Sequence, residues 1–262
     1  MTWVWEHLGE IASYAVSHAL LAGVPLLVGL ALALPIGWLA RRVTWLTGVV
    51  VGGSGLLYTI PSLALFILMP LVLGTRILDD ANVYVAMTIY TLALLVRSVV
   101  DALGSVPEST ALAATAMGYR RLGRALAVDL PLAVPVLASG LRVAAVSNVS
   151  IVSVASLIGY PQLGYYLTDG YQRSFPLEIA VGIVACVLLA LLFDLAIRAG
   201  AWALTPWARP SAGSPSAGSP TAGSRYSATA RRSWNTSTQP ATQPATQPAT
   251  QPVAPNGDGG EP

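Results

Sequence analysis

Lysine is absent from this sequence of 262 residues, and all 14 of its Lys and Arg positions are Arg. A P-loop that binds ATP uses a Lys to reach the β- and γ-phosphates. We therefore expect that the chain does not hydrolyse ATP through a Walker A motif. If ATP drives a process in which it takes part, another polypeptide must hydrolyse it.

Cysteine and histidine are nearly absent as well. Cys186 is the single cysteine, and His7 and His18 are the two histidines. One thiol forms no intrachain disulfide or thiolate metal cluster, and these two histidines alone make no zinc site. No nucleophile with its base and no metal-ligand set stands out. We predict no catalytic residue, no metal, no cofactor and no nucleic-acid partner.

Charged residues are scarce: they make up 10% of the chain, whereas 54% is hydrophobic and the mean hydropathy is +0.64. This composition lies outside that of ordinary soluble domains and indicates a protein whose solvent is the lipid bilayer. A membrane-spanning helix needs roughly 20 mostly apolar residues. The uncharged runs predict an all-α, polytopic membrane protein with about five transmembrane helices, within residues 19–40, 43–75, 81–96, 143–168 and 179–193.

The second of these runs is too long for one straight span. As a helix, residues 43–75 would measure about 50 Å at ~1.5 Å per residue, against a hydrocarbon core of ~30 Å. Proline removes a backbone donor and clashes with the preceding turn, and paired glycines lower the helix propensity. The run must be broken, tilted or partly interfacial, and the expected break points are Pro61 and the pair Gly52 and Gly53.

The distribution of arginine predicts the orientation in the membrane. With five spans, most arginines fall on one side: Arg41, Arg42, Arg120, Arg121, Arg124, Arg198 and Arg209. The opposite loops hold Arg76 and Arg173 beside acidic residues. The positive-inside rule then places the N-terminus outside and the C-terminus inside the cytoplasmic membrane of a prokaryote.

Composition divides the chain into three parts. Residues 1–18 contain acidic residues ahead of the first span, so we expect a retained extracytoplasmic N-terminus and not a cleavable signal peptide. Residues 19–209 form the transmembrane domain. Residues 210–262 are low-complexity Pro, Ser, Thr and Ala sequence that cannot bury enough apolar surface to fold. We expect a disordered cytoplasmic tail, which is either dispensable or a tether.

Residues 105–131 form a basic loop between the third and fourth predicted spans. Ser105 and Glu108 have the spacing of a capping box, with Pro107 in the first turn, so we expect a short helix to begin there. Gly118 and Gly123 allow turns further on. The loop is either a docking segment for a cytoplasmic partner or an ordinary basic loop that obeys the positive-inside rule.

The spacing within this loop resembles a family signature. It consists of two Ala, a Gly four positions after the second, an aliphatic residue, one free position, Leu and Pro, here Ala113, Ala114, Gly118, Val128, Leu130 and Pro131. This pattern resembles the coupling loop of binding-protein-dependent ABC importer permeases, which usually have Glu where this chain has Leu112. The resemblance implies a type I ABC importer permease fold with a cytoplasmic coupling helix. The residues implied for ATPase coupling are Leu112, Ala113, Ala114, Met117, Gly118, Tyr119, Leu122 and Pro131.

Three further segments, residues 58–65, 95–97 and 157–164, resemble permeases for glycine betaine, choline and carnitine. The resemblance implies ATP-driven import of such an osmoprotectant by alternating access. It also implies ABC ATPase subunits, an extracytoplasmic solute-binding protein and a second permease subunit, in a homodimer or a heterodimer.

Three competing functions stay open. Related permeases for amino acids and methionine share the loop. An ion-coupled secondary transporter would also be polytopic, although the intramembrane carboxylates and the internal repeat typical of that class are not evident. A non-transporting membrane scaffold could use the loop to bind a different partner.

Candidates for the substrate pathway lie at the predicted break and at mid-membrane, because broken helices and intramembrane polar residues often mark substrate sites. They are Tyr58, Pro61, Ser62 and Asn148, with a weaker polar stripe of Tyr84, Thr88 and Thr91. Asn148 could equally form a hydrogen bond between helices. The stripe could equally serve helix packing and interface anchoring.

Spacings of four residues predict several contacts near these candidates. Gly140, Ala144 and Asn148 form a small-residue stripe that lets a neighbouring backbone come close. Opposite charges one turn apart can pair on a helix. Arg97 and Asp101 have this spacing and can pair. Asp194 and Arg198 have it too, near the end of the last span, and indicate a capped inner helix end in preference to a proton relay.

Overall fold

The computed structural model describes residues 2–208, and every regular element within them is a helix. In chain order the elements are α1 (Thr2–Glu6), α2 (Leu8–Ala40), α3 (Thr44–Tyr58), α4 (Ser62–Leu73), α5 (Asp80–Gly104), α6 (Glu108–Ala116), α7 (Arg121–Arg124), the π-helix η1 (Ala125–Asp129), α8 (Leu130–Val154), the 3₁₀ helix η2 (Ala155–Ile158), α9 (Tyr165–Gln172), α10 (Pro176–Leu204) and the 3₁₀ helix η3 (Pro206–Ala208). The predicted tail, residues 210–262, lies outside the described residues.

Four helical stretches are long and apolar enough to cross a membrane: α2, α5, the continuous stretch Arg121–Ile158 and α10. The pair α3 and α4 forms a fifth if the two helices together make one span. This agrees with the predicted fold class of about five transmembrane helices. The observed helices are longer than the uncharged runs in the sequence. A charged side chain at a helix end can reach the membrane–water interface, so it does not end the helix.

The second span is broken at Pro61. α3 and α4 meet at an angle of 100°, and Pro61 has the extended conformation (φ −60°, ψ 129°) just before α4. A proline disfavours helical conformation in the residue before it, which explains why α3 ends at Tyr58. The Tyr90 hydroxyl of α5 donates to the Ile60 carbonyl and holds the break against the core.

The second candidate break point, at Gly52 and Gly53, is wrong, because both residues lie inside the continuous helix α3. Glycine lowers helix propensity by only about 1 kcal/mol, whereas proline costs about 3 kcal/mol in a helix interior. A helix in an apolar span can therefore contain a pair of glycines, whereas a proline interrupts it.

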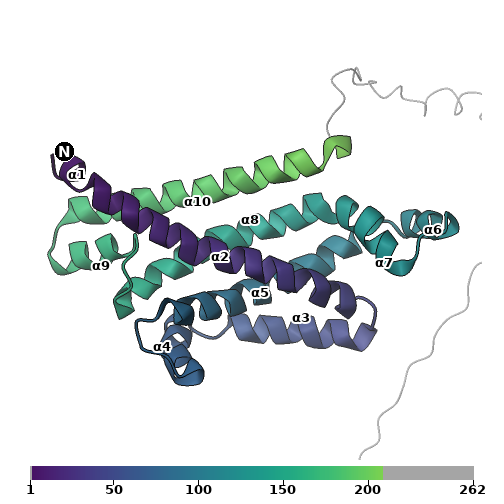
Figure 1. Cartoon of the computed structure of the whole chain (residues 1–262), viewed down its shortest axis with the longest axis horizontal. Helices are drawn as coiled ribbons and strands as arrows, with labels where there is room; N and C mark the ends of the chain where they lie inside the picture. Colours follow the sequence, from purple (N-terminus) through teal and green to yellow (C-terminus); the bar gives the residue numbers. More distant parts are fainter. Residues whose placement is uncertain (1, 209–262) are drawn as a thin grey trace, which may run out of the picture. The chain divides into compact units, whose positions relative to one another are not determined.

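α5 is the central helix of the domain. It contacts α2, α3, α4 and α8 (Figure 1), and its buried residues recur around much of its circumference. The packing forms two hydrophobic clusters. One includes Phe66, Met87, Tyr160, Leu163 and Tyr166, and the other includes Leu26, Leu95, Val99 and Leu137.

The predicted small-residue stripe on α8 does lie at a close helix contact. A Cβ atom at Gly140 would lie 2.5 Å from the Ser98 Cβ of α5, so only glycine lets these helices approach this closely. Ala144 and Asn148, one and two turns further on, are also buried. The stripe therefore fixes the distance between α5 and α8.

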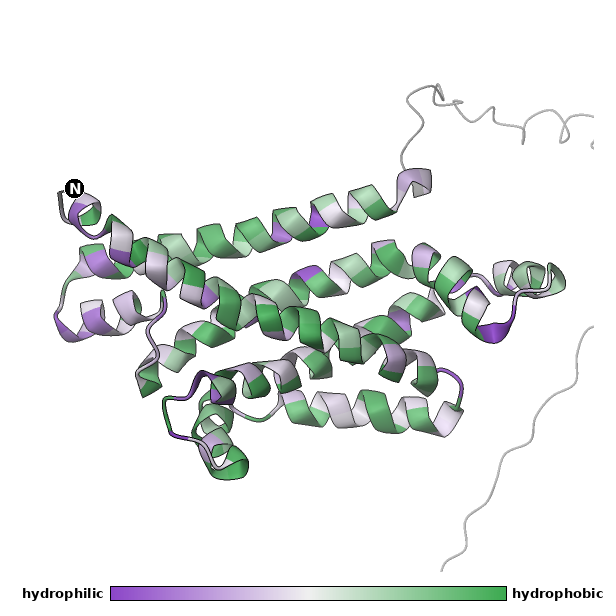
Figure 2. Cartoon of the chain, viewed as in Figure 1, coloured by the Kyte–Doolittle hydropathy of each residue, from purple (hydrophilic) through white to green (hydrophobic). Residues whose placement is uncertain are grey.

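Large apolar side chains cover the outside of the described domain. On α10 they include Ile183, Val184, Val187, Leu188, Leu191, Leu192 and Leu195, and Figure 2 shows this helix coloured as hydrophobic over most of its length. Apolar side chains on an outer face are stable in lipid, which confirms a multi-pass membrane protein.

Of the two oppositely charged pairs at a spacing of four residues, one forms an ion pair. Arg198 Nε lies 2.9 Å from Asp194 Oδ2, and Arg142 of α8 binds the other oxygen of the same carboxylate. Arg97 and Asp101 are not among the ion pairs found within residues 2–208, so that prediction is wrong. Both side chains are exposed, and an exposed pair gains too little to fix two flexible side chains.

Candidate functional site

The 105–131 segment begins with a helix, as predicted, but not with the predicted capping box. α6 starts at Glu108 after Pro107 in an extended conformation, and no side chain caps it. The Ser105 hydroxyl instead donates to the Ala102 carbonyl at 2.7 Å, because Ser105 is still the C-cap residue of α5. The S-x-x-E spacing is misleading here because the two helices follow each other within a few residues.

A Schellman motif terminates α6, with Met117 as the C-cap and Gly118 as the residue after it. The Tyr119 N–H donates to the Ala114 carbonyl at 3.2 Å, and the Gly118 N–H donates to the Thr115 carbonyl at 3.0 Å. Gly118 has a φ of +88°, a conformation that L-residues with a Cβ rarely adopt. No atom lies within 4 Å of a Cβ placed there, so the backbone conformation, and not lack of space in this chain, requires glycine.

Several large apolar side chains of the 105–131 segment are exposed. Leu112, Met117, Leu122 and Leu126 are between 62% and 71% exposed. Tyr119 and Ala113 are also exposed, and Pro131 is half-buried at the start of α8. Exposed apolar side chains clustered on one short segment are typical of a protein interaction site. Sequence reasoning missed Leu126, although it follows Leu122 by four residues, the spacing of one helix face.

Ala114 differs from the other residues predicted for ATPase coupling. It is 1% exposed, on the side of α6 that packs against α7 and η1. A partner that docks on the exposed side would not touch it. Its small side chain instead permits the close packing of α6 on its own segment.

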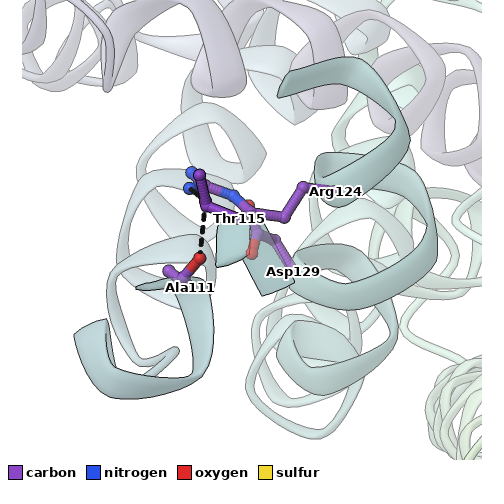
Figure 3. A network of polar contacts seen from close by, with 4 residues as sticks. All are labelled: Ala111, Thr115, Arg124 and Asp129. Atoms are coloured by element: carbon purple, nitrogen blue, oxygen red, sulfur yellow. Dashed lines mark hydrogen bonds and ion pairs between the residues drawn. The ribbon is translucent and has the colours of Figure 1, made fainter. Parts of the chain in front are cut away.

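A polar network holds this packing together (Figure 3). Arg124 Nε lies 3.3 Å from Asp129 Oδ2, and Arg124 Nη1 donates to Thr115 Oγ1 at 3.3 Å. Thr115 Oγ1 donates in turn to the Ala111 carbonyl at 2.8 Å (Figure 3). Arg124 thus joins α6 to η1. The sequence places Arg124 only on the positive side of the membrane, and no local spacing reveals its partner on the other helix.

A π-helical turn connects the segment to the membrane domain. In η1 the Leu130 N–H donates to the Ala125 carbonyl, five residues earlier. The wider turn precedes Pro131, which has no N–H and would crowd the carbonyl of the preceding turn in an α-helix. The helix therefore continues from α7 into α8 despite the proline, and it links the exposed segment mechanically to a membrane-spanning helix.

Three of the candidate pathway residues lie at the break between α3 and α4. Tyr58 and Pro61 are exposed and Ser62 is half-buried. The Tyr58 ring lies edge-on to Tyr90, with ring centroids 6.0 Å apart. The break therefore presents an aromatic ring on the surface of this subunit.

Asn148 lies apart from them in the core and is 0% exposed. Its Nδ2 donates to the Ala22 carbonyl of α2 at 3.1 Å and to the Thr91 hydroxyl of α5 at 2.8 Å. The Thr91 hydroxyl donates to the Met87 carbonyl at 2.7 Å. Asn148 thus makes hydrogen bonds between helices, the structural role that its position in the sequence left open.

The residues of the weaker polar stripe, Tyr84, Thr88 and Thr91, differ in burial. Thr91 is buried with Asn148, whereas Tyr84 and Thr88 are half-buried and Thr88 donates to the Tyr84 carbonyl at 2.7 Å. His18, for which the sequence suggests no role, is a second buried link between α2 and α8, with Nε2 3.0 Å from the Val149 carbonyl oxygen. A single histidine in an apolar helix gives no sequence signal for such a bond.

Residues 26–209 match the protein family described as "Binding-protein-dependent transport system inner membrane component". The chain belongs to this family, and is therefore the membrane-embedded permease component of a transporter and not its catalytic part. The resemblance inferred from the 105–131 segment is confirmed.

Individual relatives agree with the family match. The chain is 32% identical over 204 residues to the osmoprotectant import permease protein OsmW of Salmonella typhimurium, covering 77% of this chain and 94% of that protein. It is 25% identical over 198 residues to the choline transport system permease protein OpuBB of Bacillus subtilis, covering 76% and 90%. Its fold resembles a chain of the MetNI methionine ABC transporter in an inward-facing conformation, with a TM-score of 0.64 at 21% identity, covering 76% of this chain and 97% of that chain. The type I ABC importer permease fold is thereby confirmed.

Proposed function

We propose that this chain is the permease subunit of an ATP-driven importer that moves a small osmoprotectant, such as glycine betaine, choline or carnitine, into the cytoplasm. The observation that carries the proposal is the set of exposed apolar side chains on the 105–131 segment, which continues as a helix into a membrane span in a chain of this family. The names of the relatives OsmW and OpuBB support the substrate class.

The orientation follows from the arginines. The N-terminus lies outside, and the 105–131 segment and the C-terminus lie in the cytoplasm. Arg41 and Arg42 line one cavity together with Arg121 and Arg124, so arginines far apart in sequence gather at one end of the domain. This grouping supports a single positive, cytoplasmic side.

The ATPase is a separate subunit that docks on Leu112, Met117, Leu122 and Leu126. These side chains supply the apolar contact, and the exposed Arg120 supplies a polar rim, the usual arrangement of an interface. ATP-driven movement of the segment would pass through η1 into α8. A second permease subunit and an extracytoplasmic solute-binding protein complete the transporter.

The substrate crosses beside the break between α3 and α4. Tyr58 offers an exposed aromatic face, which attracts a quaternary ammonium group by cation–π interaction. Asn148 acts in this proposal as a positioning residue that fixes α2, α5 and α8, because its polar atoms already bind within the chain.

Solute-stimulated ATP hydrolysis tests the substrate class. The permease is purified with its ATPase and solute-binding protein, and glycine betaine, choline, carnitine and methionine are compared. We expect stimulation by at least one quaternary ammonium solute and none by methionine. Stimulation by methionine alone would overturn the osmoprotectant assignment. An ATPase that does not co-purify with the permease would overturn the role of the 105–131 segment.

A further inference from the structure

A basic cavity lies beside the 105–131 segment where α2 and α5 end. It has a volume of about 920 Å³, within the range of ~300–1,000 Å³ usual for sites that bind small molecules. Arg41, Arg42, Arg121 and Arg124 line it, with Glu108 and Asp129 as its acidic residues. We call this cavity the arginine pocket.

The arginine pocket has an excess of positive charge. Arg124 is neutralised by Asp129, at 3.3 Å. Arg41, Arg42 and Arg121 are exposed and form no ion pair within residues 2–208. Glu108 is the remaining acidic residue on the wall. Guanidinium groups gathered around one cavity repel each other, and an anion between them removes that repulsion.

The walls hold these guanidinium groups in place. The Arg42 Cζ lies 3.6 Å from the centroid of the Trp38 ring, a cation–π contact. The Arg41 Nη1 lies 3.8 Å from where a Cβ of Gly104 would be, so the Arg41 side chain crosses from α2 to the end of α5. The two arginines that follow α2 are thus directed along the wall by contacts that leave their N–H groups available.

The backbone adds to the positive potential from one side. α6 begins at the cavity, since Pro107 and Glu108 both line it, and the first-turn N–H groups of a helix favour an anion. The ends of α2 and α5 act in the opposite sense, because C-terminal carbonyls favour cations and so stabilise Arg41 and Arg42. An anion must therefore bind through the guanidinium groups, which match the geometry of phosphate oxygens.

We propose that the arginine pocket binds the phosphate group of an anionic phospholipid from the cytoplasmic leaflet. This rests on the orientation in the proposed function. A lipid is favoured over free phosphate because Trp38, on the wall of the pocket, is an interfacial type of residue. Leu39, the next residue along the chain, is 51% exposed and offers apolar surface to an acyl chain. Basic pockets between membrane helices on the cytoplasmic side suit such headgroups. The bound lipid connects α2, α5 and the 105–131 segment.

Lipid retention by full-length permease tests this site. The protein is extracted from vesicles of phosphatidylglycerol and phosphatidylcholine, and the lipids that remain bound are counted by native mass spectrometry. The test variant replaces the unpaired arginines of the pocket: Arg41→Gln, Arg42→Gln and Arg121→Gln. The control removes the same charge from exposed arginines that do not line the pocket: Arg76→Gln, Arg97→Gln and Arg120→Gln.

We expect the wild type and the control to retain phosphatidylglycerol about tenfold or more above its share of the vesicle, and the test variant to lose that enrichment. The corresponding Arg→Lys variant keeps the charge but not the planar guanidinium groups, and we expect it to keep part of the enrichment, which shows that the loss in the Arg→Gln variant is not a failure to fold. Equal enrichment in the test variant would overturn the proposal. Binding of inorganic phosphate at the arginine pocket without any enrichment of phosphatidylglycerol would overturn the assignment to a lipid headgroup.

An ATPase pull-down from the same preparations separates this site from the proposed function. A wild type that binds the ATPase without enriching phosphatidylglycerol contradicts the lipid site alone. A wild type that enriches phosphatidylglycerol at the arginine pocket without binding the ATPase supports the lipid site and contradicts the proposed function.

Discussion

At the scale of single residues, Gly118 makes the most specific contribution to the 105–131 segment. Its left-handed conformation ends α6 and turns the chain towards α7. An L-residue in that conformation costs roughly 1–2 kcal/mol. Both Gly118→Ala and Gly118→Trp should therefore weaken ATPase binding and uptake, and Gly118→Trp should do so more because its ring also covers the exposed surface.

The matched control for Gly118 is Gly123→Ala. Gly123 lies inside α7 without a left-handed conformation, and no atom lies within 4 Å of a Cβ there. Alanine should be neutral or slightly stabilising at that position. ATPase pull-down and uptake in the same membranes measure both effects. Normal coupling in Gly118→Trp would mean that the segment is an ordinary loop.

Asn148 gives a second prediction for a single residue. Asn148→Leu removes its bonds to Ala22 and Thr91 and leaves buried polar atoms without a partner, which costs about 1–3 kcal/mol. We expect a lower melting temperature of the purified permease, with Ser150→Ala, an exposed change on the same helix, as the control. Loss of uptake at an unchanged melting temperature would instead assign Asn148 to the substrate pathway.

At the scale of elements, substitutions of exposed apolar residues in and next to α6 and α7 should differ in how strongly they reduce ATPase recruitment. Met117→Glu and Leu122→Glu should abolish ATPase recruitment without affecting membrane insertion, because each puts a charge into an apolar contact. Leu112→Glu should be tolerated or only mildly harmful, since Glu is the usual residue of the family at that position. Ser109→Glu, on an exposed part of α6, is the control. Pull-down with the ATPase separates the variants, and undiminished recruitment by Met117→Glu would place the docking surface elsewhere.

Sequence patterns within one segment were sufficient to predict the membrane-spanning helices, but they were not sufficient to predict the contacts between helices. Long uncharged runs indicated the spans, and Pro61 indicated the break, because desolvation of the backbone and the chemistry of proline act within one segment. The capping box at Ser105 failed because the end of the preceding helix competes for the same hydroxyl. The links from Arg124 to Thr115, and from Asn148 to Ala22, depend on which helices pack together, and no spacing along the chain encodes that.

At the scale of the whole molecule, the orientation in the membrane predicts which cysteines an impermeant reagent can reach in intact cells. The native Cys186 is replaced by Ala to remove its background. Leu122→Cys should stay unlabelled until the cells are opened, and Tyr171→Cys on α9, which is 79% exposed, should be labelled at once. The reverse pattern would invert the topology and place the 105–131 segment outside.

The central claim is that ATP hydrolysis by a separate subunit drives import through this permease, and uptake into sealed vesicles tests it most directly. The permease, its ATPase and its solute-binding protein are reconstituted with the arginine-rich side facing the ATP, and accumulation of radiolabelled choline or glycine betaine is followed. We predict uptake that requires ATP and all three components, survives ionophores that collapse ion gradients, and is lost in Gly118→Trp. Accumulation without the ATPase, driven by a proton or sodium gradient, would contradict the account.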